Sequence, residues 1–154
     1  MKIHTLKTKQ KLPIDIKSAW EFFSSPKNLQ TITPEYLSFK MVDDELPDKM
    51  YPGTIIVYKI KPLFGIPITW VTEIKHMQEY KFFIDEQVFG PYKMWHHKHF
   101  FKEIEGGTEM EDLVHYTMGW SIFGSIALKL IIRKQLNGIF EFRRKKLIEL
   151  FGEI

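Results

Sequence analysis

The chain has 154 residues, enough to bury a core in one domain, and its lack of Cys excludes disulfides, thiolate metal sites and a cysteine nucleophile. Its net charge of +3 is too mild to indicate nucleic-acid binding, and aromatic residues, at 15%, suffice for a large core or an aromatic-lined pocket. The N-terminus lacks the apolar segment of a signal peptide, and no run approaches the roughly 18 apolar residues of a membrane-spanning helix. We therefore expect a single domain, residues 1–154, in the cytoplasm, with no transmembrane segment.

Short elements are predicted for most of the chain. Residues 2–12 alternate weakly, which indicates an edge or half-exposed strand. Asp15 is suited to cap a helix that continues to about residue 24, and Ser25-Pro26 begins a second short helix. Further strands, separated by turns rich in Gly and Pro, are expected at residues 37–43, 54–61, 68–77, 81–89, 94–105 and 108–118.

One long helix is predicted from Ser125 to Phe151. Its apolar side chains form a wide stripe, which suits packing on a sheet better than a coiled coil. The stripe contains Leu128, Ile131, Ile132, Leu136, Ile139, Phe140, Leu147 and Leu150, with Gln135 and Arg143 inside it. The order of strand, two helices, six strands and a long helix indicates an α+β fold rather than alternating βαβ units.

Several residue patterns follow one another along the strands and the last helix. They are Trp70-x-Thr72-x-Ile74, Phe83-x-Asp85-x-Gln87-x-x-Gly90-Pro91, Trp95-x-His97-x-His99-x-Phe101, Gly107-Thr108 with Asp112, Val114 and Tyr116, and Ile139-Phe140-x-x-Arg143. In this order they resemble a bacterial ligand-binding subfamily of the START-like (SRPBCC) superfamily, which has the Bet v 1-type helix-grip fold. The resemblance covers almost the whole chain and departs from it at Met118-Gly119-Trp120, where a Pro-Gly type turn is expected.

The resemblance implies a curved antiparallel sheet of about seven strands wrapped around a long C-terminal helix. It further implies two short helices after the first strand and a cavity between the sheet and the long helix. Members of the superfamily include lipid carriers, hormone receptors and cyclases, so the fold does not fix the function.

The last hairpin carries the most informative polar residues. A two-residue turn at Gly106-Gly107 would place His99 opposite Val114 and Phe101 opposite Asp112. Because side chains alternate between faces, one face then looks toward the long helix. That face carries Trp95, His97, His99, Phe101, Met110, Asp112, Val114, Tyr116 and Met118.

Two His, an Asp and a Tyr are unusual on an inward face, because an unpaired buried polar group costs about 1–3 kcal/mol. They could form a self-satisfied network or the polar end of a ligand cavity. A metal site from His97, His99 and Asp112 is a third possibility, although a sheet brings such ligands together less readily than a helix. Arg143, inside an apolar stripe, needs a carboxylate from Asp112 or Asp85, or it anchors an anionic ligand.

The sequence predicts a carrier or sensor that binds a small hydrophobic or amphipathic molecule between the sheet and the C-terminal helix. The alternative is a cyclase- or dehydratase-type enzyme acting on an aromatic or polyketide-like substrate, with His97 or His99 beside Asp112 as its acid or base. An interaction domain with a filled core is a third hypothesis. We predict no catalytic residue, metal, cofactor or nucleic-acid partner. The ligand-binding residues are expected to be Trp70, Phe83, Asp85, Gln87, Trp95, His97, His99, Phe101, Met110, Asp112, Tyr116, Leu128, Ile132, Gln135, Ile139 and Arg143.

Overall fold

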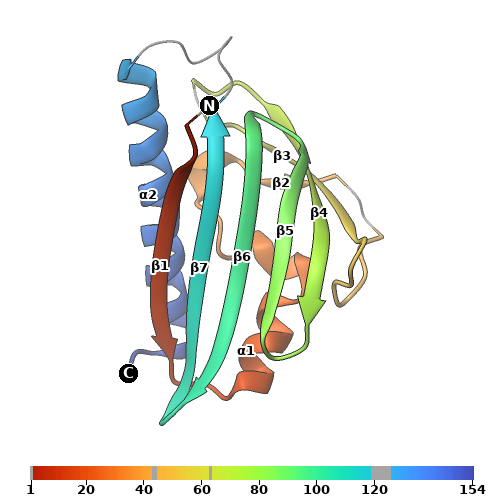
Figure 1. Ribbon diagram of the computed structural model, residues 1–154, viewed down its shortest axis with the longest axis vertical. Helices are drawn as coiled ribbons and strands as arrows, with labels where there is room; N and C mark the ends of the chain where they lie inside the picture. Colours follow the sequence, from red (N-terminus) through yellow and green to blue (C-terminus); the bar gives the residue numbers. More distant parts are fainter. Residues whose placement is uncertain (1, 43–44, 63, 119–125) are drawn as a thin grey trace.

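A curved antiparallel sheet of seven strands, in the order β1-β7-β6-β5-β4-β3-β2, holds one long helix (Figure 1). The computed structural model describes residues 2–42, 45–62, 64–118 and 126–154, without the side chains of residues 126–128. The strands are β1 His4–Leu12, β2 Lys40–Met41, β3 Ile55–Ile60, β4 Ile68–Gln78, β5 Phe82–Phe89, β6 Tyr92–Ile104 and β7 Gly107–Met118. The predicted α+β helix-grip fold, with β1 at one edge, is confirmed.

The first helix, α1 (Ile16–Phe23), covers the end of the sheet near the β6–β7 hairpin (Figure 1). Asp15 caps it as predicted, because its carboxylate accepts a hydrogen bond of 2.9 Å from the backbone N–H of Ser18. Two short 3-10 helices follow, η1 (Pro26–Leu29) and η2 (Glu35–Leu37). These elements close one end of the space between the sheet and the last helix.

The strand predicted at residues 37–43 is much shorter than expected. Leu37 ends η2, and Ser38 adopts a left-handed backbone conformation with φ of 47°. A residue in that region turns the chain instead of extending it, so ladder pairing begins only at Lys40, opposite Lys59.

The β6–β7 hairpin has a different register from the predicted one. Its two-residue loop is Glu105-Gly106, with Gly106 at φ of 81°, so Ile104 pairs with Gly107. Gly107 lacks a side chain for another reason: a Cβ there would lie 2.0 Å from the carbonyl oxygen of Leu12 in β1. The glycine therefore permits the close approach of β1 and does not form the turn.

This register differs from the predicted one by two residues, so every side chain stays on its expected face. The inward face of the hairpin is buried at Trp95, His97, His99, Phe101, Met110, Asp112, Val114 and Tyr116. Met118 at the end of β7 is half-buried, and Thr117, expected outside, is buried as well. The predicted face is therefore right although the predicted pairs are wrong.

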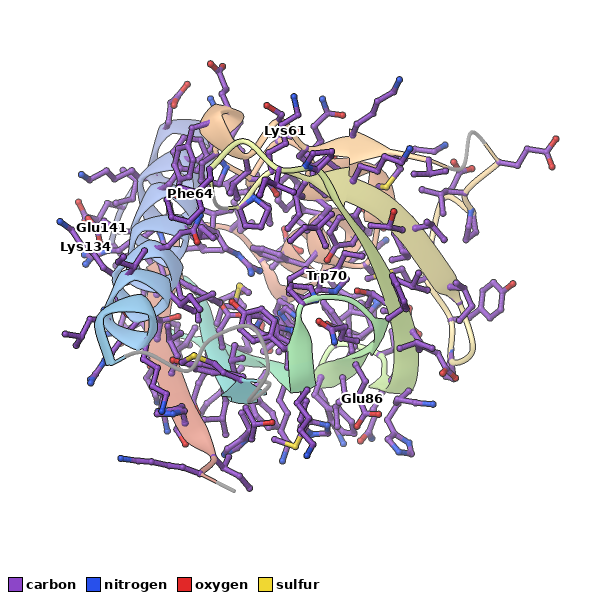
Figure 2. All side chains as sticks on the ribbon, turned by 90° about the horizontal axis from the view of Figure 1, so that it is seen from above. Lys61, Phe64, Trp70, Glu86, Lys134 and Glu141 are labelled. Atoms are coloured by element: carbon purple, nitrogen blue, oxygen red, sulfur yellow. The ribbon has the colours of Figure 1, made fainter. Side chains whose placement is uncertain are left out.

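The long helix α2 (Ile126–Phe151) packs across the inner face of the sheet. Viewed from above, Trp70 points into the space between the sheet and α2, whereas Glu86 and Lys134 point away from it (Figure 2). The buried stripe of α2 is narrower than predicted, because Ile131 and Leu150 are exposed. No described helix combines the length and apolar character needed to cross a membrane. Gly119, Trp120 and Ser125, which figured in the sequence predictions, lie outside the described residues.

Candidate functional site

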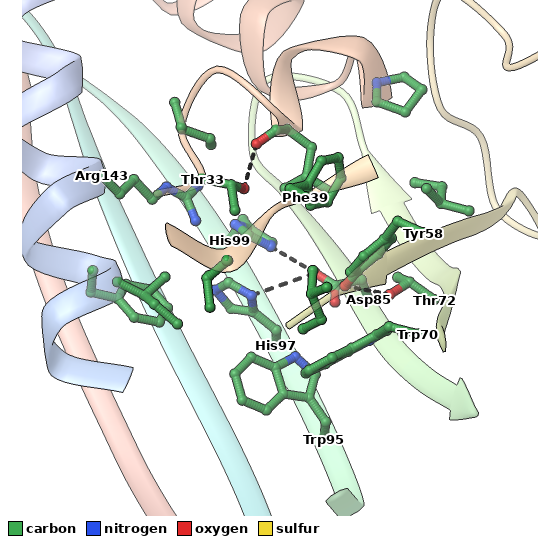
Figure 3. Close-up of a pocket in the computed structure, with 18 of the residues that line it drawn as sticks. Thr33, Phe39, Tyr58, Trp70, Thr72, Asp85, Trp95, His97, His99 and Arg143 are labelled. Carbon is green, nitrogen blue, oxygen red and sulfur yellow. Dashed lines mark hydrogen bonds and ion pairs between the residues drawn. The ribbon is translucent and has the colours of Figure 1, made fainter. Parts of the chain in front are cut away.

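A cavity of about 220 Å³ lies between the sheet and α2. Most of its wall is apolar, with aromatic rings from β3, β4 and β6 and aliphatic side chains from α2 (Figure 3). Three of these rings, Tyr58, Trp70 and Trp95, follow one another with centroids 5.9 and 5.3 Å apart. Ile132 and Leu136 face them from the helix. Such a wall favours an apolar occupant.

Most of the predicted site residues line this cavity. They are Trp70, Phe83, Asp85, Trp95, His97, His99, Ile132, Gln135, Ile139 and Arg143. Gln135 donates a hydrogen bond from its side chain to the carbonyl of Pro62, which ties α2 to the loop after β3.

The other predicted site residues lie elsewhere. Phe101, Met110 and Tyr116 are buried in the core beside the cavity, and Phe101 contacts the rings of Trp20 and Phe23 in α1. Asp112 is buried behind the two histidines. The side chain of Leu128 lies outside the described residues.

Gln87 pairs with the cavity-lining Thr72 and so shares the inward face, but its amide is bonded to the β5–β6 turn. Its side-chain amide donates to the backbone carbonyl of Tyr92 at 2.6 Å, and its amide oxygen accepts from the Tyr92 N–H at 3.1 Å. Gln87 lies near the end of β5, where these unpaired backbone groups of the β5–β6 turn are within its reach. It stabilises the turn and does not line the cavity.

Four buried side chains form a polar cluster on the wall of the cavity. Strand pairing places Asp85 of β5 opposite His97 of β6, and His99 of β6 opposite Asp112 of β7. The two imidazole rings lie side by side, with centroids 3.7 Å apart. The cluster therefore runs diagonally across three neighbouring strands.

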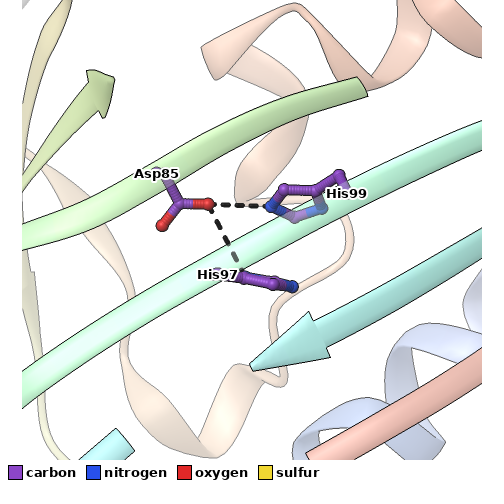
Figure 4. A group of neighbouring side chains, drawn as sticks. All are labelled: Asp85, His97 and His99. Carbon is purple, nitrogen blue, oxygen red and sulfur yellow. Dashed lines mark hydrogen bonds and ion pairs between the residues drawn. The ribbon is translucent and has the colours of Figure 1, made fainter. Parts of the chain in front are cut away.

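Each imidazole lies between two carboxylates. On the cavity side, Asp85 Oδ2 is 2.8 Å from His99 Nε2 and 3.6 Å from His97 Nδ1 (Figure 4). Behind the rings, Asp112 Oδ1 is 3.0 Å from His97 Nε2 and 2.9 Å from His99 Nδ1. The last contact is close but not aligned as a hydrogen bond.

Arg143 reaches the cluster from α2. Its Nη1 is 3.7 Å from Asp112 Oδ1, and its guanidinium lies over the rings of Phe23 and Phe140 at 5.4 and 6.0 Å. The predicted pairing with Asp112 is thus present, but it is long. The buried Nε of Arg143 has no hydrogen-bond partner among the described residues.

The charges of the cluster balance one another. Burial opposes ionisation of Asp112, but Arg143 and the imidazoles outweigh it and hold the pKa of this carboxyl well below its ordinary value. Burial also opposes ionisation of Asp85, whose pKa is nevertheless lowered by His97 and His99. Burial alone would lower the pKa of His99, but the two carboxylates raise it, whereas burial and the neighbouring His99 lower the pKa of His97. The cluster therefore favours two carboxylates against one imidazolium and one guanidinium.

Tyr58 is a cavity residue that the sequence interpretation missed. It stacks on Trp70, its hydroxyl is 3.5 Å from that of Thr72, and burial raises the pKa of its phenol. It is therefore a neutral hydrogen-bonding group in an otherwise apolar wall. Its alternation with Ile56 and Ile60 in β3 was the signal that could have identified it.

Comparisons with known proteins bear on the fold. No protein-family model matches the sequence, and no curated protein matches it. Among solved structures, protein Ms6760 from Mycobacterium smegmatis is 17% identical, with a TM-score of 0.67 over 97% of this chain and 96% of that one. Protein CV1439 from Chromobacterium violaceum is 10% identical, with a TM-score of 0.72 over 97% and 99% of the two chains.

Ara h 8.0201 is also similar, at 13% identity and a TM-score of 0.62, covering 96% of this chain and 99% of its own. The predicted Bet v 1-type, START-like fold is confirmed by these similarities. At such identities they establish the fold alone.

Proposed function

We propose that this protein binds a small hydrophobic or amphipathic molecule in the cavity between the sheet and α2, as a carrier or sensor. The observation that carries the proposal is the cavity itself: its wall is mostly apolar, and its charged groups are gathered in one buried polar cluster. Exclusion of water from apolar surface supplies the affinity, and a few fixed polar groups orient the ligand. The proposal treats residues 1–154 as one binding domain in the cytoplasm, which the absence of Cys fits.

The size of the cavity limits the ligand. Its volume of about 220 Å³ exceeds the roughly 150 Å³ that accommodates benzene in an engineered apolar cavity. It is smaller than the roughly 300–1,000 Å³ of pockets for drug-sized ligands. We therefore propose a ligand with one or two fused rings, or a short chain, in preference to a two-chain lipid.

The polar wall favours an acidic head group. Arg143 lines the cavity, its contact with Asp112 is 3.7 Å long, and its Nε has no partner among the described residues. A guanidinium with free donors binds carboxylates strongly, because its N–H groups match their geometry. The aromatic part would then lie against Trp70 and Trp95.

The experiment is calorimetric titration with two probes of one shape, 2-naphthoate and the uncharged 2-naphthalenemethanol. Both should bind the wild-type protein at one site, and naphthoate should bind more tightly. Ile132→Phe places extra volume in the cavity wall and should weaken both at least tenfold, whereas Ile131→Phe, at the exposed neighbouring position, should leave both unchanged.

Native mass spectrometry of protein purified from cells provides a second measurement. A bound hydrophobic compound of matching size would support the proposal. If neither probe binds, and no compound accompanies the protein, the proposal fails. Equal weakening by the two Phe variants would also contradict it, since Ile131 does not line the cavity.

A further inference from the structure

Three donor atoms of the polar cluster converge on one point of the cavity wall. Asp85, His97 and His99 each offer one ligand atom, and these three atoms all lie within 4.8 Å of one another. Two of the separations are 2.8 Å, from Asp85 Oδ2 to His99 Nε2, and 3.6 Å, from Asp85 Oδ2 to His97 Nδ1. Ligand atoms bound to one zinc ion at about 2.0–2.1 Å lie roughly 3.0–3.5 Å apart, so the two separations fall on either side of that range and small side-chain shifts would place the atoms around a shared ion.

We propose that Asp85, His97 and His99 form a binding site for one divalent transition-metal ion at the polar wall of the cavity. Two imidazoles and one carboxylate are the donor set of open zinc and non-haem iron sites, in which further positions remain for water or a ligand. All three residues line the cavity, so those positions would face it. The site does not depend on the ligand proposed above.

The rear of the cluster supports this assignment. Metal-binding histidines nearly always have their second ring nitrogen directed at a carboxylate or carbonyl, which fixes the tautomer and the ring orientation. Here Asp112 supplies that carboxylate to His97, whose Nε2 is hydrogen-bonded to it at 3.0 Å, and it lies 2.9 Å from His99 Nδ1 without hydrogen-bond alignment. Arg143 in turn contacts Asp112. One carboxylate therefore orients His97 by a hydrogen bond and lies directly behind His99.

The count of hydrogen-bond donors also favours a cation between the front three groups. Both nitrogens of His97 face carboxylate oxygens, but a neutral imidazole has only one N–H. With that N–H directed at Asp112, the lone pair on Nδ1 faces the oxygen of Asp85. A metal ion would satisfy the nitrogen and the oxygen together, whereas without a cation they repel each other.

The charge balance accommodates a divalent ion. Metal binding would release the proton that the cluster favours on one imidazole, after which Asp85 and Asp112 with Arg143 leave one net negative charge. A divalent cation would convert this into one net positive charge next to an apolar cavity. The bound ion could then take one anionic oxygen from a ligand or from water.

The test uses untagged protein stripped with a chelator and titrated with Co²⁺, whose visible absorption reports nitrogen and oxygen ligands. One Co²⁺ should bind per chain, and Zn²⁺ should displace it. Asp85→Asn and His99→Asn should each weaken Co²⁺ binding by about 100-fold or more. Asp112→Asn, behind the site, should weaken it by about 10–100-fold.

The matched control is the pair Glu86 and His96. These residues are the chain neighbours of Asp85 and His97 in the same two strands, and they lie on the outer face. Their side chains are 2.6 Å apart, and both are partly exposed. Glu86→Gln and His96→Asn should leave Co²⁺ binding unchanged, and circular dichroism verifies the fold of every variant. The absence of stoichiometric binding to the wild-type protein, or equal weakening by the control variants, overturns the proposal. Titration of metal-free protein with 2-naphthoate is scored separately, so failure of the metal site and failure of the ligand proposal remain distinguishable.

Discussion

Consecutive residues on β7 place two carboxylates in opposite environments. Asp112 is buried between two imidazoles and a guanidinium. Glu111 faces outward and pairs with Lys7 at 2.8 Å and Lys9 at 3.1 Å on the edge strand. Asp112 therefore interacts with fixed positive groups in place of water, whereas Glu111 stays close to solvent, which screens its ion pairs.

This contrast predicts different costs for chemically identical substitutions. Asp112→Asn should lower the free energy of unfolding by about 3–5 kcal/mol, because it leaves buried cationic groups without their counter-charge. Glu111→Gln should cost at most about 1 kcal/mol, the range of exposed ion pairs. Urea denaturation of chelator-treated protein measures both. Similar losses for the two variants would show that the buried cluster does not depend on the charge of Asp112.

Arg143 is predicted to select ligands by charge. Arg143→Met keeps an apolar stem of similar length and removes the guanidinium, so it should lower the affinity for 2-naphthoate about tenfold or more. The affinity for 2-naphthalenemethanol should stay nearly constant. Arg143→Lys, which keeps the charge but loses the planar fork, should give an intermediate result in the same titrations. Equal loss for both probes would indicate that Arg143 acts only through packing.

The sequence was sufficient to predict that His97 and His99 face inward, because alternation along a strand is a local property. It did not identify Asp85 as the carboxylate in front of them, because that contact depends on the register between β5 and β6. It also did not reveal that Gln87, which lies opposite the cavity-lining Thr72, would bond to the backbone of the β5–β6 turn. Register and turns are set by contacts between distant residues, which alternation does not encode.

At the scale of elements, the β6–β7 hairpin shows how a turn and a close contact can be confused. Gly106 and Gly107 are adjacent, and together they suggest a two-residue turn. The structure gives them separate roles: Gly106 adopts φ of 81° in the loop, while Gly107 lies against the backbone of Leu12. The sheet thereby brings β1 against the start of β7.

Alanine substitutions should separate these two roles. A Cβ at Gly106 meets no atom within 4 Å, so Gly106→Ala should cost only the left-handed backbone strain, about 1–2 kcal/mol. A Cβ at Gly107 would lie 2.0 Å from a backbone oxygen, which cannot be relieved by rotating a side chain. Gly107→Ala should therefore cost about 3 kcal/mol and increase amide hydrogen exchange along β1. Equal costs and unchanged exchange in β1 would contradict the assigned roles.

At the scale of the whole molecule, the order of elements and the long helix follow from patterns that span many residues. The stripe on α2 and the alternation of the strands each repeat often enough to outweigh local exceptions such as Ile131. The cavity could be predicted only by resemblance, because unfilled volume results from how distant surfaces meet. The strand that contains β2 was predicted too long for a related reason, since the turn at Ser38 has no strong sequence signal.

The two halves of α2 pack against different parts of the molecule. Near its C-terminal end, Leu147 is buried in a core cluster with Leu12, Trp20 and Phe101. Toward its N-terminal end, Ile132 lines the cavity, where part of its surface has no protein neighbour. A helix segment over unfilled volume gains less dispersion energy and opens at a lower free-energy cost than one over a packed core.

Amide hydrogen exchange should detect this difference. In ligand-free protein, amides of residues 132–140 should exchange faster than those of residues 145–150. Binding of 2-naphthoate at about 100 times its dissociation constant should slow the first group by up to about 100-fold, equivalent to roughly 2.7 kcal/mol. The second group should change much less, because none of its residues lines the cavity. Uniform slowing of both groups would instead mean that α2 opens as one unit, and that the cavity does not divide the helix into segments of different stability.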